Sequence, residues 1–144
     1  MTSFNVIENK ISSTRKYLSI LERYQEYSKE EIENNTDIRG AVERYLYLVV
    51  QSTIDLAESI IAYRRLRKPT TMAESFHILY ETQIIPLKLM QNLVQMTGFR
   101  NAIAHAYEDL DYSVVLDVLH NGKKGIAAFL NIVENYTSVE VPEK

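Results

Sequence analysis

Apolar residues recur at intervals of three and four along most of this sequence, the spacing that gathers them on one face of an α-helix. In residues 4–27 the predicted apolar face consists of Ile7, Ile11, Leu18, Leu21 and Tyr24. A short helix is predicted at 28–34, because Ser28 and Glu31 have the spacing of a capping box. A turn follows, in which Thr36 is the predicted cap of the next helix.

The longest helical pattern covers residues 37–67. Its apolar positions form a band broad enough to contact more than one neighbour, so we expect the central helix of a bundle here. The band consists of Val42, Leu46, Val49, Val50, Thr53, Ile54, Leu56, Ala57, Ile60, Ile61 and Tyr63. Pro69 is expected to stop this helix, because proline cannot continue the backbone hydrogen bonding.

Two more helices are predicted before residue 98. Thr71 and Glu74 again have capping-box spacing and open a helix that extends to Glu81. Pro86 is well placed as the first residue of the following helix, which continues toward Gly98. At Gly98 three alternatives stay open: a kink, a helix end, or close packing of a neighbouring element.

The C-terminal part predicts two further helical segments. Asp111 is the expected cap of the first, and Asn121-Gly122 is expected to break it. The second extends to Tyr136, and its apolar positions are Ile126, Phe129, Leu130, Ile132 and Val133.

These patterns predict an all-α fold, an antiparallel bundle of four to six helices. The chain contains only four Gly and three Pro, so few points interrupt the helices. With 144 residues we expect a single domain, 1–144, with a real hydrophobic core. Within it we expect N-terminal helices in 1–36, the core in 37–136 and a loose tail in 137–144.

Composition narrows the chemistry. The absence of Cys excludes disulfides and thiol catalysis, and it fits a reducing cytoplasm. The sequence has no signal-peptide pattern and no long apolar run, so we expect a soluble, cytoplasmic protein. A formal net charge of −3 argues against binding nucleic acid by overall charge. Any role on RNA or DNA therefore requires a local basic patch.

The one dense basic cluster consists of Arg64, Arg65, Arg67 and Lys68. The favoured interpretation is a solvated helix end whose cations complement the helix dipole. The alternative is an RNA-binding surface that adds positive potential to a cleft at Arg100. No metal or cofactor is expected, because His77 and His120 lack companion ligands and no glycine-rich phosphate loop is present.

One stretch, residues 98–107, concentrates chemically active side chains. On a helix that advances about 100° per residue, one arc is a packing face made of Phe99, Ala102, Ile103 and Ala106. The opposite arc carries a cation, an amide, an imidazole and a phenol: Arg100, Asn101, His105 and Tyr107. The small residue Ala104 leaves the surface between Arg100 and His105 open.

Arg100 and His105 suffice in principle for metal-independent cleavage of RNA. The arginine fork suits phosphate oxygens and would stabilise charge that develops on them. Imidazole exchanges a proton near neutral pH, and the 2′-hydroxyl of RNA would serve as the nucleophile. The competing interpretation is a helix whose Arg100 and His105 simply face water and whose Tyr107 lies over the core.

The Arg100-to-Tyr107 segment resembles the Arg, four residues, His, any residue, Tyr motif of the HepT-like branch of the HEPN superfamily. The similarity includes stretches at 41–46, 53–57 and 109–119 and spans roughly 37–136. One departure is Tyr45, where relatives often carry Asn. This resemblance implies a helical homodimer in which the Arg and His motifs of two chains meet in a cleft.

The resemblance also implies a function. Similar proteins are ribonuclease toxins paired with an MNT-type nucleotidyltransferase antitoxin, which transfers AMP to the motif tyrosine, here Tyr107. We therefore hypothesise a metal-independent endoribonuclease toxin of a type VII-like toxin–antitoxin pair that cleaves tRNA or mRNA. Arg100 and His105 would be catalytic, and Asn101 would orient the site.

Two rival functions stay open at this stage. The first is a non-catalytic helical subunit of a nucleotidyltransferase, which binds a nucleotide or a partner with the same Arg and His. The second is a structural dimerisation domain, which predicts that Arg100 and His105 lie apart on exposed surface.

Overall fold

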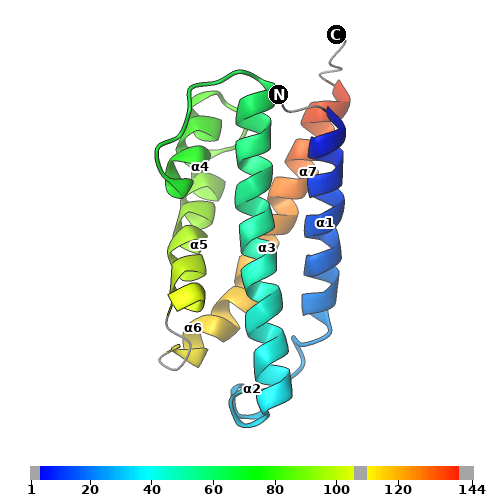
Figure 1. Ribbon diagram of the computed structural model, residues 1–144, viewed down its shortest axis with the longest axis vertical. Coiled ribbons are helices and arrows are strands. Elements are labelled where there is room, and N and C mark those ends of the chain that lie inside the picture. Colours follow the sequence, from blue (N-terminus) through cyan, green and yellow to red (C-terminus); the bar gives the residue numbers. More distant parts are fainter. Residues whose placement is uncertain (1–3, 106–109, 140–144) are drawn as a thin grey trace.

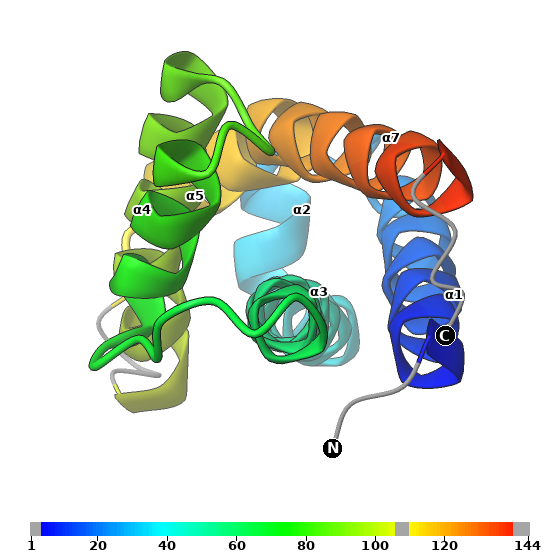
Figure 2. The same cartoon turned by 90° about the horizontal axis from the view of Figure 1, so that it is seen from above.

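Four long helices form the frame of the molecule. The computed structural model describes residues 4–105 and 110–139, and the long helices are α1 (Phe4–Glu22), α3 (Thr36–Tyr63), α5 (Leu87–His105) and α7 (Lys123–Val139). The chain direction alternates from one to the next (Figure 1). Seen from above, they surround a common interior in the order α1, α3, α5, α7 (Figure 2).

Shorter elements close the bundle. They are α2 (Lys29–Asn34), α4 (Met72–Glu81), α6 (Tyr112–Asp117) and a π-helical turn, η2 (Val118–Gly122). Helix α3 contacts α1, α2, α4 and α5, so it is the central helix that its broad apolar band predicts. No strand occurs in the described residues, and the predicted all-α bundle is confirmed. None of the helices in 4–105 and 110–139 is long and apolar enough to cross a membrane.

Helix starts follow the predicted caps with one correction. The Ser28 capping box, the Thr71 cap and the Asp111 cap are all present. The cap of α3, however, is Asn35 and not Thr36. The Asn35 backbone is extended, and its side-chain oxygen accepts the N–H groups of Asp37 and Ile38 at 3.1 and 3.2 Å.

Two helices end earlier than predicted. Helix α1 ends at Glu22, and tighter turns follow, in which Tyr24 N–H donates to the Leu21 carbonyl at 2.9 Å. Helix α3 ends at Tyr63, well before Pro69, because Arg65 adopts a left-handed conformation with φ 57°. The Arg65 N–H donates to the Ala62 carbonyl at 3.2 Å, and the Leu66 N–H donates to the Ile61 carbonyl at 2.9 Å. This is a Schellman motif without glycine.

Helix α5 does not end at Gly98, and the break expected at Asn121-Gly122 takes the form of a π-helical turn between α6 and α7. Helix α5 continues through Gly98, where an added Cβ would meet no atom within 4 Å, so close packing is not its role. At Asn121-Gly122 the backbone forms η2 and passes directly into α7. A Cβ on Gly122 would lie 3.1 Å from Val118 and 3.2 Å from Met96. Glycine therefore allows this turn to lie close against α5.

Helix α7 extends three residues beyond the predicted end, to Val139. Residues 140–144 of the predicted tail lie outside the described residues.

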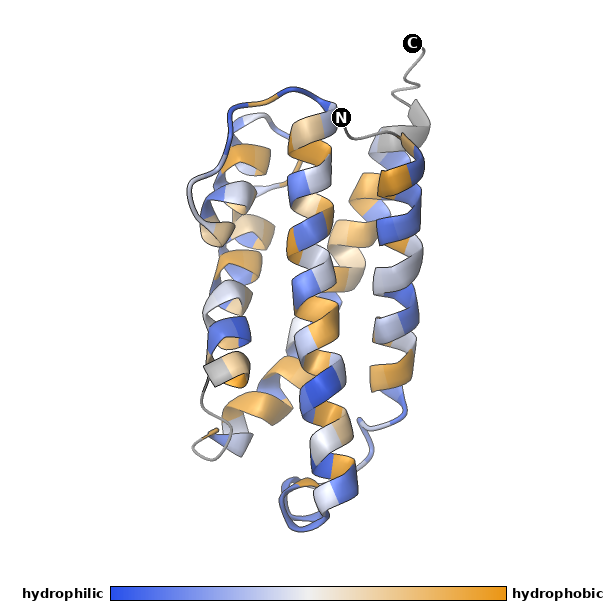
Figure 3. Cartoon of the chain, in the orientation of Figure 1, coloured by the Kyte–Doolittle hydropathy of each residue, from blue (hydrophilic) through white to orange (hydrophobic). Residues whose placement is uncertain are grey.

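The core is continuous across the four long helices. The predicted apolar positions within α1 are all buried, and Tyr24, which lies in the turns after this helix, is half-buried against the core. Phe76 of α4 meets Phe129 of α7 edge to face, with ring centres 6.0 Å apart. Polar and apolar residues alternate around each long helix, and the α3–α4 loop is mostly hydrophilic (Figure 3).

Because Phe129 is fully buried, truncating it leaves a cavity and removes the ring contact with Phe76. We expect Phe129→Ala to lower the free energy of unfolding by about 3–5 kcal/mol, measured by urea denaturation. Lys124→Ala, an exposed change on the same helix, should stay within about 0.5 kcal/mol of the wild type. A Phe129→Ala effect below about 1 kcal/mol would show that this packing is not formed.

Candidate functional site

Arg100 lies on the side of α5 that faces α3, and its guanidinium reaches two α3 side chains. Its Nε donates to Gln51 Oε1 at 2.7 Å, and its Nη2 donates to the Tyr47 hydroxyl at 3.2 Å. The centre of the guanidinium also lies 5.2 Å from the centre of the Tyr47 ring, within the range of a cation–π interaction. Arg100 is partly buried. Its side chain therefore has one defined position.

Asn101 completes this set of contacts. Its Oδ1 accepts a hydrogen bond from Arg100 Nη1 at 2.9 Å. Asn101 itself is exposed. The orienting role of Asn101 stays a prediction.

All three acceptors around Arg100 are neutral oxygens. No carboxylate of the described residues pairs with Arg100, whereas Arg15 pairs with Glu134 at 2.6 Å. Arginine carries five N–H donors and stays protonated in proteins. Arg100 therefore keeps its full positive charge and further N–H groups for an anion.

A pocket of about 390 Å³ lies between α3 and α5 next to this arginine. It is lined by Gly40, Glu43, Arg44, Tyr47, Ile103 and Ala104. Tyr47 belongs to both the pocket and the Arg100 contacts. Ala104 contributes its small side chain to the lining.

Arg44 brings a cation to the lining of this pocket, whereas Arg100 lies beside it on the other side of Tyr47 and is not among the lining residues. Arg44 is exposed, and no ion pair joins it to a described residue. The neighbouring Glu43 accepts from Arg39 Nε at 3.2 Å and from the Tyr112 hydroxyl. Arg39 also lies over the Tyr112 ring, 5.2 Å from its centre. The carboxylate is therefore occupied by its own partners, and the pocket favours an anion.

Sequence reasoning missed Arg44, Tyr47 and Gln51 as site residues. They stand three and four positions apart, so they share one face of α3. That polar line beside the apolar band was visible in the sequence. What it could not reveal is that this face meets Arg100.

The remaining motif residues are placed only in part. Phe99 and Ile103 pack into the core, with 9% and 5% of their surface exposed, whereas Ala102 is exposed and lies off the predicted packing face. His105 is the last residue of α5. Ala106 and Tyr107 lie outside the described residues. The convergence of His105 with Arg100 stays a prediction.

A family model described as Ribonuclease HepT-like matches residues 14–133. The chain belongs to the ribonuclease HepT-like family. It is 24% identical over 131 residues to the tRNA nuclease HepT of Aphanizomenon flos-aquae, covering 91% of this chain and 89% of that protein. It is also 24% identical over 131 residues to the mRNA nuclease HepT of Shewanella oneidensis, covering 90% and 97%.

A solved structure shares the fold of this HepT-like chain. It is the tri-AMPylated Shewanella oneidensis HEPN toxin in complex with an MNT antitoxin, with a TM-score of 0.82 and 23% identity. The match covers 92% of this chain and 99% of that one. The helical bundle is therefore the fold of HEPN proteins.

The basic cluster lies just beyond the C-terminal end of α3, whereas Arg100 contacts Tyr47 and Gln51 near the middle of this helix. From Gln51 to Arg64 the helix advances by roughly 20 Å, so the cluster is not near Arg100 in the same chain. Arg64 lies 5.2 Å from the centre of the Tyr136 ring. Arg65 and Lys68 are exposed. A contribution of this cluster to a cleft formed with a second chain stays a prediction.

Arg67 holds the α3–α4 loop against α4. Its Nη1 and Nη2 lie 2.8 Å from carboxylate oxygens of Glu74 and Glu81. Arg67, followed by the N–H and hydroxyl of Thr70, lowers the pKa of Glu74 to about 2. Arg67 likewise lowers the pKa of Glu81. These contacts favour a structural role for Arg67 over RNA binding.

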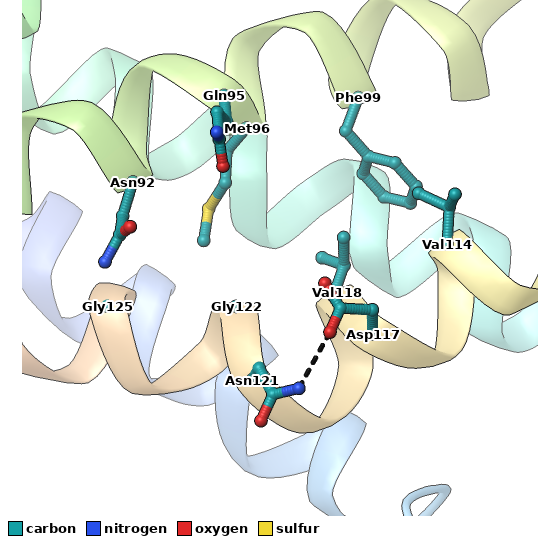
Figure 4. Close-up of a pocket in the computed structure, with 10 residues that line it drawn as sticks. All are labelled: Asn92, Gln95, Met96, Phe99, Val114, Asp117, Val118, Asn121, Gly122 and Gly125. Atoms are coloured by element: carbon teal, nitrogen blue, oxygen red, sulfur yellow. Dashed lines mark hydrogen bonds between the residues drawn. The ribbon is translucent and has the colours of Figure 1, made fainter.

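A second pocket, of about 280 Å³, lies on another side of α5, against α6, η2 and α7 (Figure 4). Its polar lining consists of Asn92, Gln95, Asn121 and Asp117, and Asn121 Nδ2 donates to Asp117 Oδ1 at 2.8 Å. Among the residues that the structure describes, no Lys or Arg lines it. The α3–α5 pocket, which Arg44 lines, is therefore the better candidate site for a phosphate.

In the described part of the chain, no three His, Asp or Glu side chains gather as metal ligands. His120 shares a hydrogen bond with the Gln25 carbonyl at 2.8 Å, which ties η2 to the turn after α1.

The contact between Arg67 and Glu74 has a pH-dependent signature. Folding lowers the pKa of Glu74 from 4.5 to about 2, so the ionised carboxylate stabilises the folded state above pH 4.5. This stabilisation diminishes as the pH falls toward 2. We expect Glu74→Gln to lower the thermal midpoint at pH 7 and to match the wild type near pH 2, followed by circular dichroism. Glu33→Gln, an exposed change on α2, serves as control. A Glu74→Gln deficit that persists undiminished at pH 2 would contradict this contact.

Proposed function

We propose that this protein is a metal-independent endoribonuclease toxin of a type VII-like toxin–antitoxin pair. The observation that carries the proposal is Arg100, a cation fixed by three neutral acceptors beside an anion-favouring pocket. Family membership and the two HepT nucleases named above support the same reaction class. RNA, either tRNA or mRNA, is the substrate.

The reaction needs no external nucleophile. The 2′-hydroxyl oxygen attacks the adjacent phosphorus, and the bond from phosphorus to the 5′-oxygen of the next nucleotide breaks. The products are a 2′,3′-cyclic phosphate and a free 5′-hydroxyl. Arg100 stabilises the charge that develops on the phosphoryl oxygens, and Arg44 binds a neighbouring phosphate.

His105 moves the protons. One imidazole accepts the 2′-hydroxyl proton, and another imidazolium donates a proton to the leaving 5′-oxygen. Because one side chain cannot readily do both in a single turnover, the proposal includes a homodimer that brings two His105 residues to a composite site. In this homodimer the same symmetry would relate the basic clusters at residues 64–68 of the two chains.

The proposed inhibitor is an MNT-type nucleotidyltransferase that transfers AMP to Tyr107. The support is the tyrosine spacing in the motif and the AMPylated HEPN toxin in complex with an MNT antitoxin. The added phosphodiester anion and base would compete with RNA phosphate and offset the charge of Arg100. Cytoplasmic RNA is the target, which places the activity in the cytoplasm.

Purified wild-type protein should cleave total RNA in the presence of EDTA and leave 2′,3′-cyclic phosphate ends. We expect His105→Ala and Arg100→Ala each to lower the rate by about 100-fold or more, because each removes a group that acts in the transition state. Helical content by circular dichroism should not change. Arg15→Ala, which removes a structural ion pair with Glu134, is the matched arginine control.

Wild-type cleavage retained by His105→Ala would overturn the acid–base assignment. Absence of cleavage by the wild type, together with tight nucleotide or partner binding, would favour the non-catalytic subunit. Loss of activity specific to His105→Ala and Arg100→Ala would exclude a purely structural dimerisation domain.

Tyr107→Phe should retain RNA cleavage and growth inhibition but escape inactivation by the nucleotidyltransferase and ATP. The reason is that phenylalanine keeps the ring and lacks the oxygen that accepts AMP. Intact mass spectrometry before and after incubation measures the modification. AMP addition to Tyr107→Phe at the wild-type level would show that another residue is the acceptor.

A further inference from the structure

Gln51 stands between Arg100 and a carboxylate. Its Oε1 accepts from Arg100 Nε at 2.7 Å, and its Nε2 donates to Asp55 Oδ1 at 2.9 Å. Gln51 and Asp55 are one turn apart on α3 and both partly buried. Lys10 of α1 approaches Asp55, with Nζ 3.9 Å from Oδ2. A continuous polar chain therefore joins α1, α3 and α5.

This chain fixes which end of the amide faces the arginine. An ionised carboxylate only accepts hydrogen bonds, so Asp55 binds the NH₂ end of Gln51. The carbonyl end must then point toward Arg100. If the amide turned over, its NH₂ would face the guanidinium and a donor would oppose a donor.

The Gln51 amide also leaves the charge of Arg100 uncompensated. A carboxylate in this position would hold the guanidinium equally well but would cancel its charge. The amide supplies a strong acceptor and adds no charge. The negative charge of Asp55 lies on the far side of the Gln51 amide from Arg100, where Lys10 partly balances it.

We infer that Gln51, oriented by Asp55, is a positioning residue that holds Arg100 in place for the phosphate without neutralising it. This inference rests on the proposed ribonuclease function. Gln51 touches no reacting atom. Its role is to restrict the guanidinium, so removing its amide should lower kcat more than it raises KM.

Two substitutions separate this role from simple packing. Gln51→Leu keeps the approximate size and removes both hydrogen bonds, so we expect a cleavage rate about 10-fold lower at every pH. Gln51→Glu at neutral pH should be slower still, because the new carboxylate neutralises Arg100 and opposes Asp55. Gln91→Glu, at an exposed position on α5, should cleave like the wild type.

The pH profile gives the decisive readout. A protonated carboxyl reproduces the glutamine pattern, with its carbonyl facing Arg100 and its hydroxyl donating to Asp55. The rate of Gln51→Glu relative to wild type should therefore rise as the pH falls from about 8 to about 4.5, whereas the ratio for Gln51→Leu stays flat. The titratable groups around this position are the same in all three proteins: Arg100, Asp55, Lys10, Tyr47, and Glu58, whose pKa is raised by burial and by Asp55. Parallel profiles for both variants would overturn the inference.

A second measurement does not depend on activity. The hydrogen bond to Gln51 should protect the Arg100 Nε–H from exchange with water, observed by NMR after ¹⁵N-arginine labelling. Gln51→Leu and Asp55→Ala should each accelerate this exchange by about 10-fold, and Gln91→Glu should not. If the wild type cuts no RNA, the proposed function fails, and this exchange alone decides the inference. Unchanged exchange in Gln51→Leu would refute it.

Discussion

The packing of α5 against α3 is the constraint on which the site depends. Helix α3 buries a broad apolar band against several neighbours, and this fixes the direction of its remaining polar face. Tyr47 and Gln51 lie on that face at the level of Arg100. The packing of the core therefore determines the position of the guanidinium, although its hydrogen-bond partners are not fully buried core residues. The bundle and the candidate chemistry share one framework.

The described arginines divide into structural and available cations. Arg15 and Arg67 are each paired with carboxylates: Arg15 joins α1 to the distant α7, and Arg67 holds the α3–α4 loop against α4. Arg100 is held just as firmly, but only by neutral oxygens. The formal net charge of −3 is thus compatible with anion binding, because local pairing and not overall charge decides which cations remain available.

Local signals in the sequence predicted most of the helices. Capping boxes and apolar spacing depend on neighbouring residues, so Ser28, Thr71 and the α3 band were predicted correctly. The end of α3 was not, because Arg65 adopts a conformation usually left to glycine. The partners of Arg100 lie 49 and 53 residues away on another helix. Only the packing of the folded chain brings them together, and no local pattern encodes that pairing.

Arg100 is central because its uncompensated charge is expected to meet RNA phosphate. The direct measurement is the salt dependence of binding to a fully 2′-O-methylated RNA, which lacks the nucleophile and cannot be cleaved. Arg100→Gln should make the slope of log K against log salt shallower by about 0.7 for each phosphate that Arg100 neutralises, and Arg15→Gln should leave the slope unchanged. An unchanged slope in Arg100→Gln would contradict the proposed role of Arg100 in binding phosphate.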